Sequence, residues 1–276
     1  MSAAKPEETA ENRVSEFYNT VGWELTDGNT EDAILWEDLR ENSREYVSKC
    51  RLRLMRHIPT DGKYMLDMAS GPIQFSEYLE YSRTYEKRYC VDLSAAALSL
   101  AEKKIGDKGV FLLGSFFDLE IPDNFFDCSL SLHTIYHMDR DQQEVAVRKL
   151  LQITKPGRPV IILYSNPHTL VSLPFRMARK VLGLLGLKSK PATQRPAENA
   201  LYFHAHPISW WDRFGDSATV EIRPWRAFAS NAQKVLIPNN KLGSWLLDIL
   251  FRLEDRYPRI FVKYFQYPMI ILVKNA

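Results

Sequence analysis

The first candidates for a ligand-binding site are in the segment 66–72, which reads LDMASGP. Asp67 closes an apolar run and is followed by the small residues Ala69, Ser70 and Gly71. A small-residue turn between a strand and a helix lets a ligand lie against the backbone, and it points helix N–H groups at that ligand. The pattern therefore predicts a ligand-binding turn, with a purely structural turn as the alternative.

A second acid, Asp92, ends the apolar run at residues 88–93. It lies about 20 residues beyond Gly71, where a carboxylate of an α/β fold can accept hydrogen bonds from both hydroxyls of a bound ribose. Leu93 is expected to line the same site. The alternative role for Asp92 is to cap the next helix, but Ser94 suits that role better.

Imidazole and phenol side chains follow the apolar run at residues 125–132, in the segment HTIYH. His133, Tyr136 and His137 are placed to orient or deprotonate a substrate at the end of that strand. An imidazole has the right unperturbed pKa for a general base near neutrality. The alternative is that these side chains cap or pack the following helix.

These residues need a scaffold that brings strand ends together, and the hydrophobic pattern predicts one. Apolar runs indicate strands at 64–68, 88–93, 110–113, 125–132, 160–164, 218–224 and 268–274. Helical spacing indicates helices at about 31–57, 73–82, 95–104, 139–154, 168–187 and 243–253. Strands alternating with helices predict an α/β fold with a parallel sheet, and such sheets bind ligands at the carboxyl ends of their strands.

Over residues 63–166 the order of these segments resembles the class I S-adenosylmethionine-dependent methyltransferases. Asp67 and Gly71 match the family's D-x-G-x-G-x-G turn, while Ala69 and Ile73 replace its first and last glycines. The resemblance implies a Rossmann-like sheet, mostly parallel with an antiparallel last strand. It also implies S-adenosyl-L-methionine as the cofactor.

The resemblance further implies roles for single residues. Asp92 would hold the ribose. Ser115 would accept a hydrogen bond from the adenine amino group, with Asp118 as the alternative acceptor, and Phe116 would cover the adenine ring, with core packing as the alternative. His133 would lie near the methyl-donating sulfur, and Tyr18 would close over the cofactor from the N-terminal flank. The implied reaction is an SN2 transfer of the methyl group to N, O or S, which depends mainly on proximity and alignment.

Substrate contacts are expected after the fifth strand and in the aromatic- and imidazole-rich stretch 202–211. The candidates are Tyr164, Asn166, His168, Tyr202, His204, His206 and Trp210. Aromatic rings grouped in this way favour a cationic or planar small molecule, and packing is the alternative. The segment at 223–226, which reads RPWR, is expected at the surface, with contact to an acidic group of the substrate as the alternative.

The pattern divides the chain into five segments. They are a disordered tail at 1–11, a helical flank at 12–60, the cofactor-binding core at 61–167, a lid or substrate insertion at 168–216, and the last two strands with an inserted helix at 217–276, which belong to the core domain. Within the lid, residues 171–187 are basic and amphipathic. A lid helix packed on the core is favoured, and peripheral contact with an anionic membrane, suited to a lipid or quinone acceptor, is the alternative.

Composition excludes several classes of protein. A formal net charge of +2 gives no field that would favour nucleic acid. Cys50, Cys90 and Cys128 form no CxxC pair, so neither a disulfide framework nor a metal site is expected. The polar N-terminus lacks a secretory signal, and no run of 18 apolar residues predicts a membrane span. A cytoplasmic protein is expected.

Two other interpretations stay open. Ala69, Ile73 and Ser115 depart from the family pattern, which would suit a non-catalytic member that binds the cofactor or a partner. A nicotinamide-dependent enzyme is disfavoured because Gln74 stands where a G-x-G-x-x-G turn has its last glycine. The sequence carries no signal for the oligomeric state or for the accepting atom.

Overall fold

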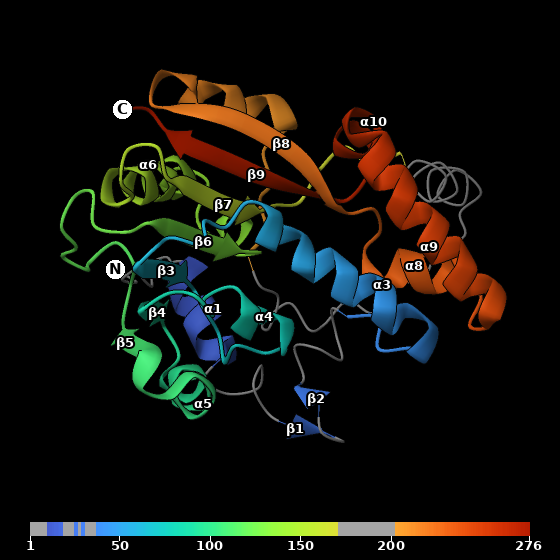
Figure 1. Cartoon of the computed structure of the whole chain (residues 1–276), viewed down its shortest axis with the longest axis horizontal. Helices are drawn as coiled ribbons and strands as arrows, with labels where there is room; N and C mark the ends of the chain where they lie inside the picture. Colours follow the sequence, from blue (N-terminus) through green and yellow to red (C-terminus); the bar gives the residue numbers. More distant parts are fainter. Residues whose placement is uncertain (1–9, 19–24, 27–28, 31–36, 171–201) are drawn as a thin grey trace, which may run out of the picture.

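The computed structural model describes residues 10–18, 25–26, 29–30, 37–170 and 202–276. At its centre is a seven-stranded sheet with the order β5-β4-β3-β6-β7-β9-β8 (Figure 1). Its strands are β3 (Tyr64–Met68), β4 (Lys87–Asp92), β5 (Gly109–Leu113), β6 (Cys128–Leu132), β7 (Pro159–Leu163), β8 (Ala218–Arg226) and β9 (Tyr267–Lys274). A separate two-stranded sheet pairs β1 (Leu25–Thr26) with β2 (Asn29–Thr30).

The described helices lie on both sides of the large sheet (Figure 1). They are α1 (Ala10–Phe17), α3 (Glu41–Leu52), α4 (Glu77–Glu80), α5 (Ala95–Ile105), α6 (Gln142–Ile153), α8 (Ser230–Leu236), α9 (Lys241–Arg256) and α10 (Pro258–Tyr264). Shorter 3₁₀ segments are η2 (Arg53–Arg56), η3 (Gly106–Lys108), η4 (Ile135–His137) and η6 (Ile208–Asp216). None of the helices in the described ranges is both long and apolar enough to cross a bilayer.

The sheet topology confirms the predicted fold class. Strands β3 to β7 pair in parallel, and β9 runs antiparallel to both β7 and β8. The chain builds outward from β3 through β4 to β5 and then returns to β6 on the other side of β3. The order reverses between β3 and β6, which is the place where open α/β sheets bind their ligands.

The central strands are mainly apolar because both faces of the sheet are covered. Successive side chains point to opposite faces. Leu66 and Ile162 therefore pack into one core with α6 and η6, while Ile161 and Ile271 pack into the other with α3 and α9. Figure 1 shows α3 and α9 side by side, and they contact each other along their lengths.

The ends of several predicted elements differ from those observed. The helix expected at about 31–57 is α3 followed by η2; residues 37–40 are not helical, and 31–36 lie outside the described part. The helix expected at 73–82 is reduced to α4 because Ile73 has a φ of 48°, which a right-handed helix excludes. The strand expected at 125–132 begins only at Cys128.

The segments around the core also differ from the predicted pattern. Ala10 and Glu11 are helical, although both fall in the predicted tail. The single helix expected near 243–253 is α9, and it is accompanied by α8 and α10. Residues 168–170 are not helical, and the rest of the helix predicted at 168–187 lies outside the described residues.

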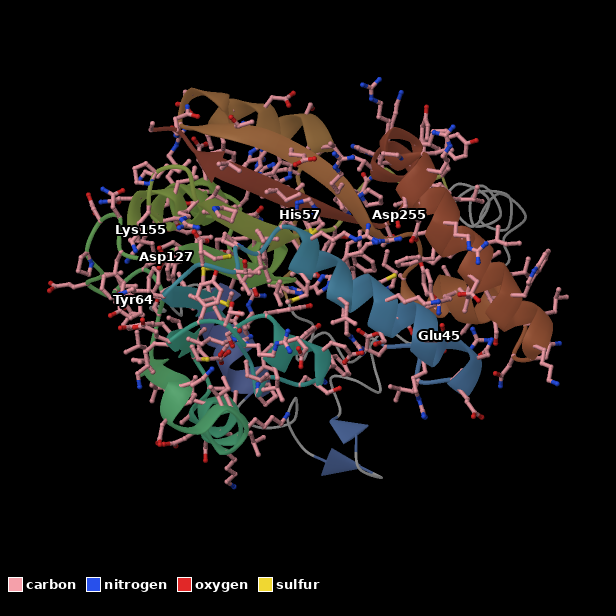
Figure 2. The ribbon with its side chains drawn as sticks, in the orientation of Figure 1. Glu45, His57, Tyr64, Asp127, Lys155 and Asp255 are labelled. Carbon is pink, nitrogen blue, oxygen red and sulfur yellow. The ribbon has the colours of Figure 1, made fainter. Side chains whose placement is uncertain are left out.

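The amino-terminal edge of the sheet is held by Asp127, just before β6. Its carboxylate accepts the backbone N–H groups of Lys63 and Tyr64 at 2.9 and 3.1 Å, and Lys155 Nζ lies 2.7 Å from it. Figure 2 shows Asp127, Lys155 and Tyr64 at this edge. Asp127 therefore has a structural role: it fixes the start of β3 at the end of the sheet opposite the carboxyl ends of the parallel strands.

Candidate functional site

A cavity of about 680 Å³ opens at the carboxyl ends of the central strands. Residues that follow β3, β4, β5 and β6 form its walls, because the reversal in strand order brings these ends together. Every residue predicted for the cofactor or for catalysis lines it: Tyr18, Asp67, Ala69, Ser70, Gly71, Asp92, Leu93, Ser115, Phe116, His133, Tyr136 and His137. The structure brings these residues to one place, and their individual roles remain predictions.

The turn after β3 follows a left-handed backbone path at alternate residues. The φ angle is 55° at Ala69, 56° at Gly71 and 48° at Ile73. Glycine adopts such angles freely, whereas a side chain at Cβ makes them costly. Ile73 is buried against Cys90 and Leu98, and this packing offsets part of the cost. Although Ala69 and Ile73 replace glycines of the family pattern, the backbone of the turn still follows the left-handed path that glycine favours.

Ala69→Gly is expected to raise the free energy of unfolding by about 1 kcal/mol, because glycine relieves the strain of a left-handed alanine. Urea denaturation of the unliganded protein measures the change. The matched control is Ser70→Gly in the same turn, where φ is not positive. Glycine there should lower stability by about 0.5–1 kcal/mol. A destabilised Ala69→Gly variant would show that the turn is not strained.

Asp92 is held at the end of β4 by two backbone donors. Its Oδ2 accepts from the N–H of Gly71 at 2.8 Å, and its Oδ1 accepts from the N–H of Ser94 at 2.9 Å. Ser94 in turn caps α5 by accepting from the N–H of Ala97 at 3.2 Å, which confirms its predicted capping role. Burial raises the pKa of Asp92 to about 6. Each carboxylate oxygen has two lone pairs, so Asp92 can still accept from a ligand's hydroxyls.

Asp67 lies at the start of the turn in a buried ion pair. Its Oδ2 accepts from Arg88 Nη2 at 2.5 Å and from Arg88 Nε at 3.1 Å. Arg88 is 1% exposed and also donates to the carbonyl of Tyr78. This pair joins the end of β3 to β4 and to α4, so Asp67 fixes the position of the turn as well as lining the cavity.

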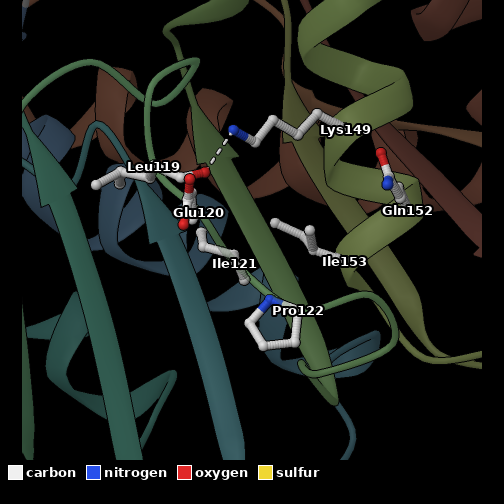
Figure 3. A pocket seen from close by; sticks show the side chains of 7 residues that line it. All are labelled: Leu119, Glu120, Ile121, Pro122, Lys149, Gln152 and Ile153. Atoms are coloured by element: carbon white, nitrogen blue, oxygen red, sulfur yellow. Dashed lines mark hydrogen bonds between the residues drawn. The ribbon is translucent and has the colours of Figure 1, made fainter.

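The wall that follows β5 is positioned by a lysine that no sequence motif indicated. Lys149 of α6 donates from Nζ to the carbonyls of Phe116, Phe117 and Leu119 at 2.8, 2.9 and 2.8 Å. Figure 3 shows Lys149 reaching the Leu119 carbonyl across a shallow hollow outside the main cavity. Within the loop, the hydroxyl of Ser115 accepts the N–H of Phe117 at 3.2 Å. These bonds hold the wall that carries Ser115 and Phe116.

His133 follows β6 with a φ of 61° and is enclosed by aromatic rings. Its ring centroid lies 4.7 Å from that of Trp225 and 5.3 Å from that of Tyr267. Its Nδ1 is buried with no hydrogen-bond partner in the described part of the chain. Burial, followed by the nearby Arg226 guanidinium, lowers the pKa of His133 to about 3. This imidazole is therefore neutral and a poor proton acceptor.

His137 has a different environment at the same end of the cavity. Its Nδ1 lies 2.7 Å from the carbonyl oxygen of Tyr202. Because a carbonyl only accepts, Nδ1 carries the proton and Nε2 keeps a free lone pair. Burial lowers the pKa of His137, and the ring of Tyr136 packs against it with centroids 4.6 Å apart. Of the three predicted catalytic residues, His137 has the geometry that best suits a base.

The cavity also contains a buried ion pair. It corrects the surface assignment of residues 224–226, whereas Arg223 is exposed as expected. Arg226 is 2% exposed, and its Nη1 donates to Glu37 Oε2 at 2.8 Å. A register shift between Pro224 and Arg226 in the pairing of β8 with β9 breaks the in-out alternation, so both Trp225 and Arg226 are buried. The sequence pattern missed this wall, which also includes Ser165, Phe203, Gln266 and Tyr267.

None of the seven predicted substrate-binding residues lines the cavity as described. The hydroxyl of Tyr164 donates to Gln143 Oε1 and accepts the N–H of His206, both at 2.9 Å. Asn166 donates to backbone carbonyls at the end of α10 and just after it, and His168 is exposed. These contacts tie β7 to its neighbours.

The aromatic stretch packs on itself beside η6. The ring of His206 stacks on Trp210 with centroids 4.4 Å apart, and His204 lies edge-on to His206 at 4.7 Å. Tyr202 contributes its carbonyl to His137, as described above. A role for these residues in substrate binding stays a prediction. Within the described ranges, no group of His, Cys, Asp and Glu is arranged to hold a metal ion.

Comparison with known proteins agrees with this geometry. Residues 66–162 match a family model described as a methyltransferase domain. No curated protein matches the chain in sequence. The DhpI-SAM-HEP complex superposes with a TM-score of 0.56 at 13% identity, over 97% of this chain and 99% of the other.

Two further solved structures share the fold. The N-methyltransferase NodS from Bradyrhizobium japonicum WM9, with S-adenosyl-l-homocysteine, gives a TM-score of 0.54 at 10% identity over 94% of this chain and 98% of that one. An N-methyltransferase from Haemonchus contortus gives a TM-score of 0.51 at 13% identity. The superposition covers 98% of this chain and 58% of that one. Residues 66–162 therefore match the model of a methyltransferase domain, and the solved structures share the fold of this chain.

Proposed function

We propose that this protein transfers the methyl group of S-adenosyl-L-methionine to a nucleophilic N, O or S of a small molecule. The observation that carries the proposal is the position of Asp92, which ends β4, faces the cavity and holds the N–H of Gly71 in the turn after β3. That arrangement suits the two hydroxyls of a ribose. When bound, the cofactor supplies an electrophilic sulfonium methyl group.

The charge of the cavity supports a cationic ligand. Its lining contains six carboxylates, Glu11, Glu37, Asp67, Asp92, Asp118 and Asp139, and within the described residues Arg226 is its only Lys or Arg. Glu37 and Asp67 are neutralised by Arg226 and Arg88. The other four form no salt bridge in the described part of the chain. An excess of negative charge attracts a sulfonium and its amino group.

The size of the cavity supports a small acceptor. A volume of about 680 Å³ is within the range of small-molecule sites, and it would have to hold cofactor and acceptor together. The Haemonchus contortus enzyme with this fold is described in complex with phosphomonomethylethanolamine, itself a small molecule. Within this proposal the acceptor binds in the same cavity, beside His133 and His137 at the carboxyl ends of the strands.

Within this proposal His137 acts as the general base for a nucleophile that carries a proton. Its Nε2 lone pair takes the proton as the nucleophile forms its bond to the methyl carbon, and the bond from that carbon to sulfur breaks. The Tyr202 carbonyl stabilises the resulting imidazolium through Nδ1–H. His133, neutral and enclosed by rings, shapes the pocket and offers a hydrogen bond without taking the proton.

Asp92→Ala is expected to weaken binding of S-adenosylhomocysteine by about 10- to 150-fold, the size of lost hydrogen bonds to a charged acceptor. Isothermal titration calorimetry measures it. Because the ionised carboxylate is the better acceptor, affinity of the unmodified protein should also fall as the pH drops below about 6. Asp107→Ala, an exposed acid outside the cavity, is the matched control. Unchanged affinity in a folded Asp92→Ala variant would remove the proposed role and, with it, the main support for the function.

A further inference from the structure

The outward side of α9 carries apolar side chains where a surface helix is normally polar. Gly243, Leu247 and Glu254 are its buried positions, and the opposite side presents Leu242, Trp245, Ile249 and Leu253. Trp245 is 58% exposed and Leu242 is 56% exposed. These four residues are spaced three, four and four apart, so they form one stripe along the helix. We refer to them as the α9 ridge.

The charges beside the α9 ridge all have one sign. Arg252 and Arg256 lie on the same side of the helix as Trp245, and Lys241 precedes it. In the described part of the chain these three cations form no salt bridge. Arg256 instead lies over the ring of Tyr257, 5.7 Å from its centroid.

The acidic residues of α9 point elsewhere, toward α3 and η2. Asp248 Oδ1 pairs with Lys49 Nζ at 2.9 Å, and Glu254 Oε2 pairs with Arg53 Nη1 at 2.6 Å. Asp255 pairs with Arg56 at 3.0 Å. Asp248 and Asp255 are partly exposed, but each is paired with a cation of α3 or η2. The side of α9 that carries the ridge therefore remains positive and apolar.

The same composition continues at both ends of α9. Val235 and Leu236, at the end of α8, are exposed next to Lys234. Ile260, in α10, is 50% exposed next to Arg259. Outward tryptophan and aliphatic side chains mixed with Lys and Arg are typical of helices that lie in the interface of an anionic bilayer.

We propose that the α9 ridge docks this protein on an anionic phospholipid surface, with Trp245 and its aliphatic neighbours in the headgroup region and the basic side chains on the lipid phosphates. A second copy of the chain fits this surface less well, because a symmetric contact would bring Arg252 and Arg256 of both copies together. The α9 ridge lies on the side of α9 that faces away from its buried positions. It therefore projects from the surface and does not form a groove that could hold a peptide. The inference stands apart from methyl transfer.

Vesicle co-sedimentation of the full chain tests this inference. Vesicles of phosphatidylcholine alone are compared with vesicles in which part of it is replaced by phosphatidylserine. Binding is expected only to the second kind, and added salt should weaken it. Arg252→Gln and Arg256→Gln should each weaken binding by about fivefold, and Trp245→Ser by at least about tenfold.

Matched variants on other exposed helices serve as controls. Val145→Ser on α6 removes an apolar side chain that is 51% exposed, and Lys103→Gln on α5 removes an exposed charge. Neither should change binding. Quenching by brominated lipid reports insertion directly. It should fall in Trp245→Phe, because Trp245 is 58% exposed whereas Trp210, Trp211 and Trp225 are buried.

Three results would overturn the inference. The first is no binding to phosphatidylserine vesicles by the folded chain. The second is binding that Trp245→Ser leaves unchanged. The third is a change in oligomeric mass on sedimentation velocity in Trp245→Ser with vesicle binding unaffected, which would assign the ridge to a second copy instead.

Discussion

His137→Ala is expected to lower the rate of methyl transfer by about 10²- to 10⁴-fold, the usual contribution of a positioned general base. Affinity for S-adenosylhomocysteine should stay within about threefold, because the imidazole is proposed to act on the acceptor rather than on the cofactor. The measurement uses labelled methyl donor and the acceptor identified by screening. His57→Ala, a half-buried imidazole after η2 that does not line the cavity, is the matched control.

The pH profile separates a base from a packing residue. Burial holds the pKa of His137 below its usual 6.5, so the base form predominates at neutral pH. The value of kcat/KM should therefore rise with pH up to that lowered pKa and remain level through neutrality. The His137→Ala variant should lose this acid limb. Equal losses of turnover and cofactor affinity, with the pH profile unchanged, would show that His137 only supports the cavity wall.

His133→Ala provides the internal comparison. With a pKa of about 3, His133 is deprotonated throughout the working range, so its removal should not change the pH profile. Turnover should still fall more than cofactor affinity, because the side chain shapes the acceptor end of the cavity. If neither quantity changes, the polar residues after β6 are structural.

Arg88→Met should lower the free energy of unfolding by about 3–5 kcal/mol, the cost of removing one partner from a buried ion pair. Arg88 is 1% exposed and Asp67 is 2% exposed, so the remaining carboxylate would be buried without its cation. Urea denaturation at neutral pH measures the loss. The double variant Asp67→Asn with Arg88→Met should recover part of it, because no charge is then left unpaired.

The matched control for this prediction is Arg158→Met. Arg158 also forms an ion pair, with Asp61 at 2.6 Å, but Asp61 is 71% exposed. Solvent screens an exposed pair, so this variant should remain close to the parent in stability. Equal effects of Arg88→Met and Arg158→Met would mean that burial does not strengthen the dependence on Arg88.

Local sequence patterns were enough to predict the features of this protein that depend on neighbouring residues. Alternating apolar runs and helical spacing located the strands within a few residues. Because parallel strands end at one edge, the polar residues after each run could be assigned to a common site. Asp92 and His137 were found in this way, and both line the cavity.

Other parts of the site were decided by contacts between distant segments. Arg226 is buried because β8 shifts register against β9, and its partner Glu37 is 189 residues away. The tautomer of His137 is set by the carbonyl of Tyr202, 65 residues further along the chain. Lys149 holds the loop after β5 from α6, 33 residues further along the chain than Phe116.

Contacts between distant segments also explain why the substrate contacts predicted in the aromatic stretch at 202–211 do not line the cavity. Its composition suited a pocket wall, but His206 stacks on Trp210 and the phenol of Tyr164 holds the backbone of His206, so these side chains face each other in packing beside η6. Composition and spacing predict which groups a segment carries. The direction in which those groups point is set by the tertiary packing energy, summed over contacts that no local pattern contains.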